Sequence, residues 1–257
     1  MIKIDKRAAV DPKAELGENV QVGPFTIIEE NVRIGENSLI APGVHIASGT
    51  RIGKNVRIFT GAVLGTIPQD LKFGGEETIL EIGDETTIRE HATLNRGTHE
   101  SRVTRIGKNC LIMAYAHVAH DCHIGENVIL ANAVNLAGHV TIEDWAAIGG
   151  MVPVHQFIRI GMHSFIGGGY RVAKDVPPYV RVMGEPLQFG GINLIGLKRR
   201  GFSQAQLSRI KKAYRIIYQM KLNVSQAIKR IKAEMDLTDE VKKIVEFIEQ
   251  SERGIVR

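Results

Sequence analysis

The chain has few aromatic residues, few cysteines and no long apolar segment. Aromatic residues make up 5% of its 257 residues, and Trp145 is the only tryptophan. Two cysteines cannot form a disulfide framework, so we expect Cys110 and Cys122 to be reduced core residues in a cytoplasmic protein. No run of about 18 apolar residues occurs and no apolar stretch follows a basic start. This predicts neither a membrane span nor a signal peptide.

What the chain does contain is a strict period of six. From Val10 to Val172, 25 of the 28 residues met at steps of six are Val, Ile or Leu, and only Asp70, Glu76 and Glu100 depart from the rule. An α-helix, with about 3.6 residues per turn, cannot keep one face in phase with six over such a length. Hexapeptide repeats are instead the signature of a parallel β-helix. Three hexads then make one coil, so residue i is predicted to lie beside residue i+18.

A second, smaller inward position follows each aliphatic position by four residues. Ala14, Val20, Thr26 and Cys122 are examples, and Gly, Asn and Asp recur between the two kinds of position. Those turn residues suit the corners of a prism. One coil cannot bury its aliphatic face alone, so coils about 4.8 Å apart are expected to stack into a continuous core.

The pattern changes near Pro186 and divides the chain into residues 1–185 and 186–257. Beyond Pro186 the apolar spacing becomes helical. Three helices are predicted, each after an N-cap residue. The first follows Ser203 and ends near residue 220, the second follows Ser225 and ends near 235, and the third follows Thr238 and ends near 251. These helices can cover the open end of the β-helix, whose last strands would otherwise expose unpaired edges.

Basic charge is concentrated in this helical part. Residues 186–257 hold 15 Lys and Arg against seven Asp and Glu, a net charge of +8, whereas the rest of the chain has a net charge of −3. An acidic partner is therefore expected. Nucleic acid is disfavoured because no aromatic residues interleave with the basic ones to stack bases. An acidic carrier protein or a phosphate-bearing substrate fits the charge better.

Two stretches interrupt the repeats, at residues 66–78 (TIPQDLKFGGEET) and 98–104 (THESRVT). Insertions of this kind project from a solenoid without disturbing its stack. The first contains Gln69, Asp70 and Lys72 beside the flexible pair Gly74–Gly75, which indicates a substrate-binding loop. The alternative is that both insertions are loops that the fold tolerates and that have no function.

A histidine-rich segment, AYAHVAHDCHIG, follows the second insertion. The three-hexad coil predicts that one corner gathers six residues from three coils: His120, Asp121, Gly138, His139, His155 and Gln156. His123 and His163 are expected to be ordinary surface histidines. Zinc is a competing explanation for the cluster, but imidazoles on successive coils do not resemble a tight tetrahedron of ligands.

The motifs QDLK, AHVAHDC, VHQF and LKRRGF, in this order, resemble those of the UDP-N-acetylglucosamine O-acyltransferases. The resemblance covers essentially the whole chain and implies a mainly β fold, a left-handed parallel β-helix followed by a small α-helical C-terminal domain. The N-acyltransferases of the same pathway are less similar. They carry an additional N-terminal uridine-binding domain, for which a chain whose hexads begin by Val10 leaves no room.

The resemblance implies transfer of an (R)-3-hydroxyacyl chain from acyl carrier protein to the 3-hydroxyl of UDP-N-acetylglucosamine, the first step of lipid A biosynthesis. No cofactor is implied. His120 matches the general base, Asp121 the residue that orients it, and Gly138 the glycine whose N–H stabilises the oxyanion. Gly168 matches the position that limits acyl length. Members of the family form homotrimers with active sites between subunits, so the resemblance implies a homotrimer.

Further positions of the family match residues that contact substrate. These are Asp70, Lys72, His117, His139, His155 and Gln156, with Asn193, Arg199 and Arg200 near the nucleotide. Two residues depart from the family pattern: Ile195 stands where some members carry Glu, and Asn95 where some carry His. The first departure concerns the uridine contacts, and neither touches the base or the oxyanion site.

Three alternatives stay open. Some relatives acylate a 3-amino sugar and form an amide. Another hexapeptide acyltransferase, using coenzyme A or a different nucleotide sugar, would carry similar repeats. A β-helix scaffold without enzymatic activity, with the basic helices as its binding surface, is the third.

Overall fold

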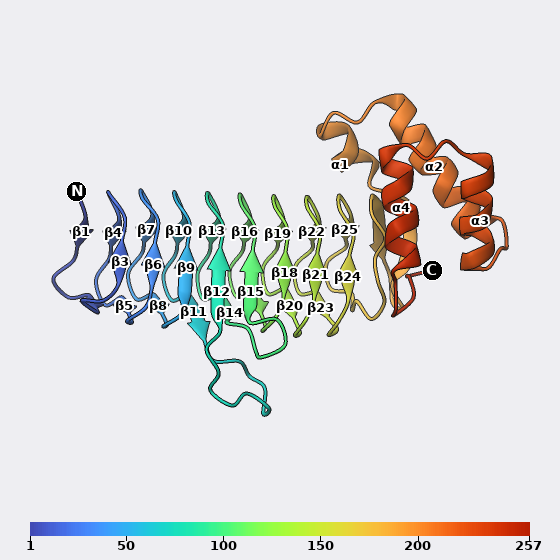
Figure 1. The fold of residues 1–257 in the computed structure, drawn as a ribbon. Coiled ribbons are helices and arrows are strands. Elements are labelled where there is room, and N and C mark those ends of the chain that lie inside the picture. The colour runs from blue at the N-terminus through green and yellow to red at the C-terminus, as the bar shows by residue number, and fades with distance from the viewer.

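The structure, a computed structural model that describes residues 1–257, is a three-sided prism of short strands with helices at its C-terminal end (Figure 1). Each coil contributes one strand to each of three sheets, which we call A, B and C. Within the prism all strand pairs are parallel, and the one antiparallel pair, β26 with β27, closes its end. The predicted fold class, a parallel β-helix followed by a helical C-terminal region, is confirmed.

The strands of the three sheets have the following bounds. Sheet A contains β1 (Lys3–Ile4), β4 (Gln21–Val22), β7 (Leu39–Ile40), β10 (Arg57–Ile58), β13 (Thr87–Ile88), β16 (Leu111–Ile112), β19 (Ile129–Leu130), β22 (Ala147–Ile148), β25 (Phe165–Ile166), β26 (Val180–Met183) and β27 (Gln188–Ile192). Sheet B contains β2 (Ala9–Val10), β5 (Ile27–Ile28), β8 (His45–Ile46), β11 (Val63–Thr66), β14 (Thr93–Asn95), β17 (His117–Val118), β20 (Asn135–Leu136) and β23 (Pro153–Val154). Sheet C contains β3 (Glu15–Leu16), β6 (Arg33–Ile34), β9 (Thr50–Ile52), β12 (Ile79–Ile82), β15 (Val103–Ile106), β18 (His123–Ile124), β21 (Thr141–Ile142) and β24 (Arg159–Ile160).

The strand register confirms the three-hexad coil and explains its interruptions. Lys3 pairs with Gln21, a step of three hexads. The step is five hexads where Arg57 pairs with Thr87 and four hexads where Thr87 pairs with Leu111. The first insertion therefore adds two whole hexads and the second adds one. This preserves the aliphatic phase along the chain, and the three acidic exceptions to the period all lie inside the insertions.

The inward side chains form one hydrophobic core. Ile58, Leu94 and Leu136 are fully buried at the large positions, and Cys122 is buried as a free thiol at a small one. Hydroxyl groups at small positions are also satisfied, since Thr26 Oγ1 donates a hydrogen bond to the Ala41 carbonyl oxygen at 2.9 Å. Stacking aliphatic side chains over successive coils gives the rigid frame on which the corners are carried.

The corners use left-handed backbone, which is held by asparagine on some coils and by larger residues on others. Between sheets C and A the asparagines at 19, 37, 55, 109 and 127 have φ of 52–59°, a conformation that Asn tolerates well. Between sheets B and C the same conformation is held by Asp121, His139 and Phe157, with φ of 58–65°. Phe25, Tyr115, Met151 and Trp145 hold it at the other two corners, with φ of 59–63°, so this conformation does not by itself mark a functional corner.

The coil continues past the last hexad. β25 pairs in parallel with β26, and β27 folds back antiparallel on β26. The period predicted neither of these last strands nor the short helix α1 (Leu194–Arg199) that follows.

Three longer helices follow, and two of the predicted caps are confirmed. α2 (Gln204–Gln219) begins after Ser203, whose hydroxyl accepts from the Gln206 N–H in a capping box. α4 (Asp239–Glu249) begins after Thr238. The prediction for α3 (Val224–Glu234) was wrong, because the N-cap is Asn223, two residues before Ser225, which forms a capping box with Gln226.

The C-terminal helices and tail dock on the last coil (Figure 1). Asp175 forms a parallel bridge with Ile255 and accepts a hydrogen bond from Ser251 Oγ at 2.6 Å. The Tyr218 hydroxyl donates to the Val256 carbonyl oxygen at 2.8 Å. The end of the prism is thus covered, as expected. None of the helices combines the length and the hydropathy that crossing a bilayer requires.

Candidate active site

The edge between sheets B and C, which we call the B–C corner, carries both insertions and the histidine cluster. The first insertion joins β11 to β12 and the second joins β14 to β15 (Figure 1). The next three coils turn the same corner at residues 119–122, 137–140 and 155–158. Nine predicted site residues therefore lie along one edge: Gln69, Asp70, Lys72, His120, Asp121, Gly138, His139, His155 and Gln156.

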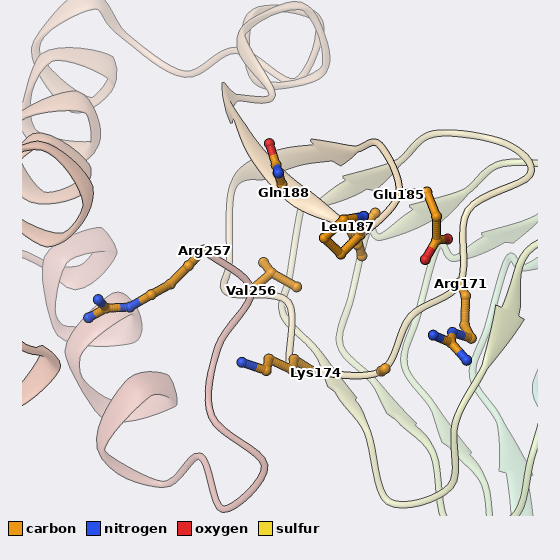
Figure 2. A pocket seen from close by; sticks show the side chains of 9 residues that line it. Arg171, Lys174, Glu185, Leu187, Gln188, Val256 and Arg257 are labelled. Carbon is orange, nitrogen blue, oxygen red and sulfur yellow. The ribbon is translucent and has the colours of Figure 1, made fainter.

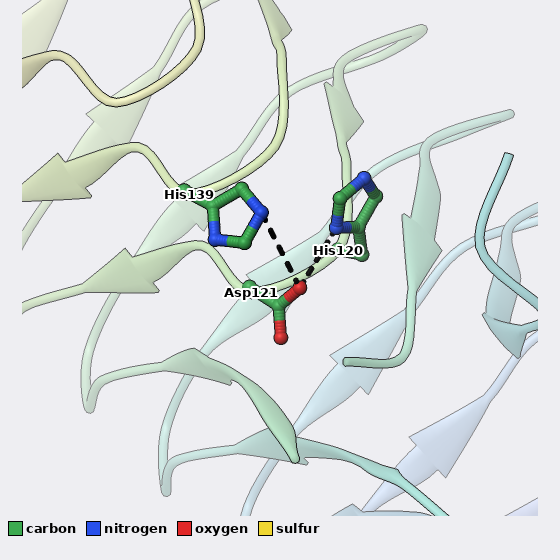
Figure 3. Close-up of side chains that lie close together, drawn as sticks. All are labelled: His120, Asp121 and His139. Carbon is green, nitrogen blue, oxygen red and sulfur yellow. Dashed lines mark hydrogen bonds and ion pairs between the residues drawn. The ribbon is translucent and has the colours of Figure 1, made fainter. Parts of the chain in front are cut away.

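His120 and Asp121 form a hydrogen-bonded pair at this corner. His120 Nδ1 lies 2.8 Å from Asp121 Oδ2 (Figure 3). A carboxylate only accepts hydrogen bonds, so Nδ1 carries the proton and Nε2 of the neutral ring is left free to take one. The His120 side chain is 14% exposed and that of Asp121 is fully buried. The pair is therefore enclosed while the imidazole still reaches solvent.

The second insertion surrounds the Asp121 carboxylate with donors. Oδ1 accepts from the Thr98 N–H at 2.9 Å and from Ser101 Oγ at 2.5 Å, and Oδ2 accepts from Thr98 Oγ1 at 2.7 Å. Burial raises the pKa of Asp121, but hydrogen bonds from Ser101, Thr98 and His120 outweigh it and hold the pKa well below its usual range. The carboxylate is therefore ionised. Neither hydroxyl residue was identified from the sequence, where only their place in an insertion marked them.

Gly138 lies directly beside His120, as the coil count predicted. A Cβ atom on Gly138 would come within 2.6 Å of His120 Cε1 and 2.8 Å of Nε2. No backbone hydrogen bond uses the Gly138 N–H, whereas the neighbouring His139 N–H donates to the His120 carbonyl oxygen at 3.1 Å. The glycine therefore leaves both space and an unused N–H donor next to the Nε2 edge of the imidazole.

His139 completes the cluster. Its Nε2 lies 3.8 Å from Asp121 Oδ2 (Figure 3), and its ring meets the His120 ring edge-on at 5.1 Å between centroids. The other face of His139 stacks on Phe157 at 4.5 Å, and the Arg253 guanidinium lies 5.7 Å from that phenyl ring. Sequence reasoning missed Phe157 and Arg253. Their contacts connect the C-terminal tail to the B–C corner.

A metal ion was the alternative interpretation of this cluster. Ligand atoms of His120, Asp121 and His139 lie within 4.8 Å of one another, which is close enough for a shared ion. Each Asp121 oxygen, however, already accepts two hydrogen bonds from protein donors. A metal would have to displace these donors. The donor set therefore suits a hydrogen-bonded dyad better than a metal centre.

The remaining polar residues around the dyad are held to different degrees. His117, on β17, has its Nδ1 2.7 Å from Thr93 Oγ1. Burial lowers the pKa of His117, and repulsion from His120 lowers it further. His155 and Gln156 are exposed one coil beyond Gly138, and the His155 Nδ1 contacts only the Gln156 carbonyl oxygen at 3.2 Å. These side chains are free to turn toward a ligand.

The three predicted residues of the first insertion stand outside the prism. Gln69 and Lys72 are exposed, and the Lys72 N–H donates to the half-buried Asp70 at 3.0 Å. Asn95 anchors the base of this loop, because its buried amide donates to the Ile67 carbonyl oxygen at 3.1 Å. The loop residues are therefore available to a ligand but do not contact the dyad within the chain.

Three predicted nucleotide residues lie at a different corner, between sheets C and A. The Arg200 guanidinium lies 5.0 Å from the Trp145 ring and 3.4 Å from His163 Nδ1. Asn193 caps α1 and donates to the His163 carbonyl oxygen at 2.9 Å, while Arg199 is exposed. These residues are therefore separated from the dyad by sheet C.

His163 is not the ordinary surface histidine that we expected. Its ring stacks between Trp145 and Tyr179, with centroids 6.1 and 5.7 Å away. Burial, together with the charge of Arg200, lowers the pKa of His163 to about 4. The ring is therefore neutral near pH 7, where it can accept a hydrogen bond from Arg200. Its position on the coil one step after Trp145 was the signal in the sequence.

Gly168 lies exposed at the third corner, between sheets A and B. A side chain added there would start 3.1 Å from the Gly150 carbonyl oxygen.

A pocket of about 220 Å³ lies nearby at the end of the prism (Figure 2). Its lining includes Arg171, Lys174, Glu185 and Arg257 but none of the predicted site residues. The proposed chemistry therefore belongs to the corner and not to this pocket.

Family models match both parts of the chain. A model described as bacterial transferase hexapeptide (six repeats) matches residues 13–48, 31–66 and 104–138. A model described as UDP N-acetylglucosamine O-acyltransferase, domain 2, matches residues 175–256.

Full-length relatives bear a consistent name. Proteins from Alkalilimnicola ehrlichii (52% identical) and Janthinobacterium sp. (49% identical) match over the whole of both chains, and each is named acyl-[acyl-carrier-protein]–UDP-N-acetylglucosamine O-acyltransferase. Among solved structures, the UDP-N-acetylglucosamine acyltransferase of Bacteroides fragilis is 48% identical with a TM-score of 0.97, covering 99% of this chain and 100% of that one. The Francisella novicida enzyme is 41% identical with a TM-score of 0.96, covering 100% and 94%.

Proposed function

The chain belongs to the UDP-N-acetylglucosamine O-acyltransferase family, and from that membership we propose how its residues carry out the reaction. The enzyme transfers an acyl group from acyl carrier protein to an oxygen of UDP-N-acetylglucosamine, the first step of lipid A biosynthesis. The donor we propose is an (R)-3-hydroxyacyl thioester, and the acceptor is the 3-hydroxyl of the sugar.

His120 is the proposed general base. The observation that carries this proposal is the position of Nε2, which faces away from Asp121 and toward the space that Gly138 leaves open. Nε2 takes the proton of the sugar hydroxyl as that oxygen attacks the thioester carbonyl. The buried, ionised Asp121 holds the ring and stabilises the imidazolium that forms. A positioned base of this kind contributes about 10²–10⁴-fold to the rate.

The oxyanion is the second charge to be stabilised. As the sugar oxygen bonds to the carbonyl carbon, negative charge develops on the carbonyl oxygen. The unused Gly138 N–H is the proposed donor, since it lies beside the base and needs no rearrangement. A donor of this kind contributes roughly 3–4 kcal/mol. Collapse of the intermediate breaks the carbon–sulfur bond, and the imidazolium returns its proton to the departing thiolate.

Substrate binding is proposed to need more than one subunit. Arg199 and Arg200 suit a diphosphate, because guanidinium groups bind phosphate oxygens in pairs. They lie at the corner across sheet C from His120. One side of the prism contains six residues at about 3.3 Å each, so the two corners are up to about 20 Å apart. A homotrimer in which neighbouring prisms meet would bring His120 of one subunit near Arg200 of the next. Gln69, Asp70, Lys72, His117, His139, His155, Gln156 and Asn193 are the other proposed substrate contacts.

Gly168 is proposed to limit acyl length. It lies at the A–B corner, so a chain bound at His120 would reach it along the face of sheet B or between subunits. Without a side chain it leaves room for a longer acyl chain.

The departures from the family pattern are compatible with this proposal. Ile195 is exposed on α1 beside the nucleotide residues, so any missing contact affects binding of the nucleotide and not the dyad. Asn95 is 2% exposed and anchors the substrate loop.

We also propose two domains, residues 1–185 and 186–257, and a cytoplasmic location, where acyl carrier protein is found.

A transfer assay tests the function directly. Purified protein is given UDP-N-acetylglucosamine and 3-hydroxyacyl carrier protein, and the product is treated with mild base, which cleaves an ester and leaves an amide. We expect an ester with this donor and far slower transfer from the matching coenzyme A thioester. Equal rates with coenzyme A, or preferred acylation of the 3-amino sugar, would favour another hexapeptide acyltransferase. No transfer to any nucleotide sugar would favour a binding scaffold.

A further inference from the structure

The second insertion has no role in the mechanism described so far, although it touches the dyad more closely than any other segment. It joins β14 to β15 and spans the B–C corner one coil before His120. Three of the four hydrogen bonds to the Asp121 carboxylate come from this insertion. The remaining one comes from His120.

We propose that Thr98 and Ser101 are positioning residues for catalysis. This inference rests on the proposed role of His120 as general base. Thr98 and Ser101 fix the rotamer and the charge of Asp121 so that its Oδ2 points at His120 Nδ1. Thr98 contacts both carboxylate oxygens, Oδ1 through its N–H at 2.9 Å and Oδ2 through its hydroxyl at 2.7 Å. Ser101 contacts Oδ1 at 2.5 Å. Such a two-point grip leaves the carboxylate no freedom to rotate about its Cβ–Cγ bond.

Burial makes these contacts matter. Thr98 is 3% exposed and Asp121 is 2% exposed, so water cannot replace a lost donor easily. The backbone of Asp121 is held from the same side, because its N–H donates to the fully buried Thr104 Oγ1 at 2.8 Å. The backbone of Asp121 is left-handed, with φ of 58°, a conformation that Asp adopts more readily than most residues. The hydroxyl groups of the preceding coil therefore hold the buried carboxylate in one geometry.

The insertion is itself anchored from the substrate loop. Glu76, in the first insertion, accepts a hydrogen bond from the His99 N–H at 3.0 Å through Oε1 and from the Gly74 N–H at 2.8 Å through Oε2. Because His99 follows Thr98 directly, Glu76 fixes the peptide group next to the one that binds Asp121. The two insertions therefore form one unit with the dyad.

The test is a double variant that removes both hydroxyl groups without changing the charge. Thr98→Val with Ser101→Ala is measured beside Thr98→Ser, Ser101→Ala alone and Thr86→Val. Thr86 is an equally buried threonine that donates to the Gly107 carbonyl oxygen and touches no site residue. For the double variant we expect kcat to fall about 10- to 100-fold, less than the roughly 10⁴-fold loss that follows replacement of an orienting carboxylate itself. KM for the nucleotide sugar should change less than twofold, and Thr98→Ser and Thr86→Val should stay within about threefold of wild-type kcat.

The pH profile separates positioning from a loss of structure. Without the two hydroxyl donors, the negative charge of Asp121 is less stabilised, so the coupled pair holds its proton more tightly. The acid limb of kcat/KM should therefore move to higher pH in the double variant. The titratable groups facing the pair are His139 from the next coil, His117 on β17, His123 on β18 and the buried Cys122, and the variants leave all of them in place.

The outcomes distinguish this inference from the proposed function. If His120→Ala abolishes turnover while the double variant keeps wild-type kcat and an unmoved acid limb, the positioning role is wrong and the base assignment stands. If the double variant does not fold, Ser101→Ala alone must still lower kcat and move the limb, because Ser101 is not part of the core. If kcat falls but the acid limb of kcat/KM does not move in any variant, Thr98 and Ser101 have only a structural role. If His120→Ala retains turnover, the proposed function fails first.

Discussion

At the residue scale, the proposed chemistry depends on one open edge of an imidazole. Two other sides of His120 are occupied: Asp121 holds Nδ1, and His139 meets the ring edge-on. Only Gly138 leaves space next to Nε2. The residue type at this position is therefore part of the mechanism, because any side chain would fill the volume that the sugar hydroxyl needs.

Gly138→Ala tests this space. The added methyl group would lie 2.6 Å from His120 Cε1, so the ring must turn away from its hydrogen bond to Asp121. We expect kcat to fall at least about 10²-fold, within the range for losing a positioned base, with little change in the thermal midpoint. Gly190→Ala is the matched control, since the nearest atom to its added methyl is the Arg181 carbonyl oxygen at 3.3 Å. Equal activity of the two variants would contradict the account.

His163 should make stability depend on pH. Its pKa in the folded chain, about 4, lies below the value of about 6.5 for an unperturbed histidine. Between these values the unfolded chain binds a proton that the folded chain does not, so stability rises with pH across this window. Urea unfolding at several pH values should show a smaller rise between pH 4 and 6.5 for His163→Gln than for wild type. Parallel curves for the two proteins would show that His163 titrates normally.

Residues of the period could be predicted, and residues of the insertions could not. Gly138 was placed beside His120 because the two residues are separated by one regular coil of three hexads. Thr98 and Ser101 lie where the spacing is interrupted, so no count of hexads relates them to Asp121, on the coil that follows. Hydroxyl groups are also common in loops, and nothing in their type marks a role.

At the element scale, the hexads predicted the β-helix because each strand repeats the same environment. The period fails where that repetition ends. β27 turns back antiparallel and α1 is a single short helix, so neither repeats a pattern that could be counted. The cap of α3 was assigned to Ser225 because serine is a common N-cap, yet Asn223 offers an equally good acceptor together with Gln226.

The corner at Gly168 should control acyl length. Gly168→Met would place a side chain at an exposed position, with its Cβ 3.1 Å from the Gly150 carbonyl oxygen. Excluding methylene groups from an apolar groove costs roughly 0.8 kcal/mol each, so the preferred donor should become shorter. Competition among donors of about ten, twelve and fourteen carbons would show the shift, and an unchanged preference would contradict it.

The basic helices should recognise the acidic carrier protein. Reversing two exposed charges on α2, with Lys211→Glu and Lys212→Glu, should raise KM for acyl carrier protein several-fold and leave KM for the nucleotide sugar nearly unchanged. Added salt should weaken binding of the carrier, because exposed charges are screened beyond about 8–10 Å. Lys3→Glu with Lys6→Glu, on the first coil, is the matched control. If salt has no effect and the variant and wild type have equal KM values for acyl carrier protein, these lysines only keep the outer face of the helix solvated.

At the scale of the whole molecule, one chain holds the proposed base and the proposed nucleotide residues at different corners. We therefore propose that a site that uses both is completed by another copy. This arrangement is consistent with a prism whose flat sides can meet in a closed ring of three.

Mixed trimers test the shared site. His120→Ala and Arg200→Ala should each be nearly inactive at low nucleotide-sugar concentration. If the subunits are exchanged in equal amounts, about a quarter of the sites should combine an intact His120 with an intact Arg200 from a neighbour, and activity should return in that proportion. Mixed trimers that form but stay inactive would show that each site lies within one chain.

The most direct test of the central claim is the turnover of His120→Ala with 3-hydroxyacyl carrier protein and UDP-N-acetylglucosamine. His123→Ala, which removes an imidazole from the outer face of β18, is assayed beside it. We predict that kcat falls at least about 10²-fold for His120→Ala, that His123→Ala stays close to wild type, and that both variants keep the circular dichroism of the native β-helix. A folded His120→Ala variant with less than about a tenfold loss of kcat would contradict the account and require another base.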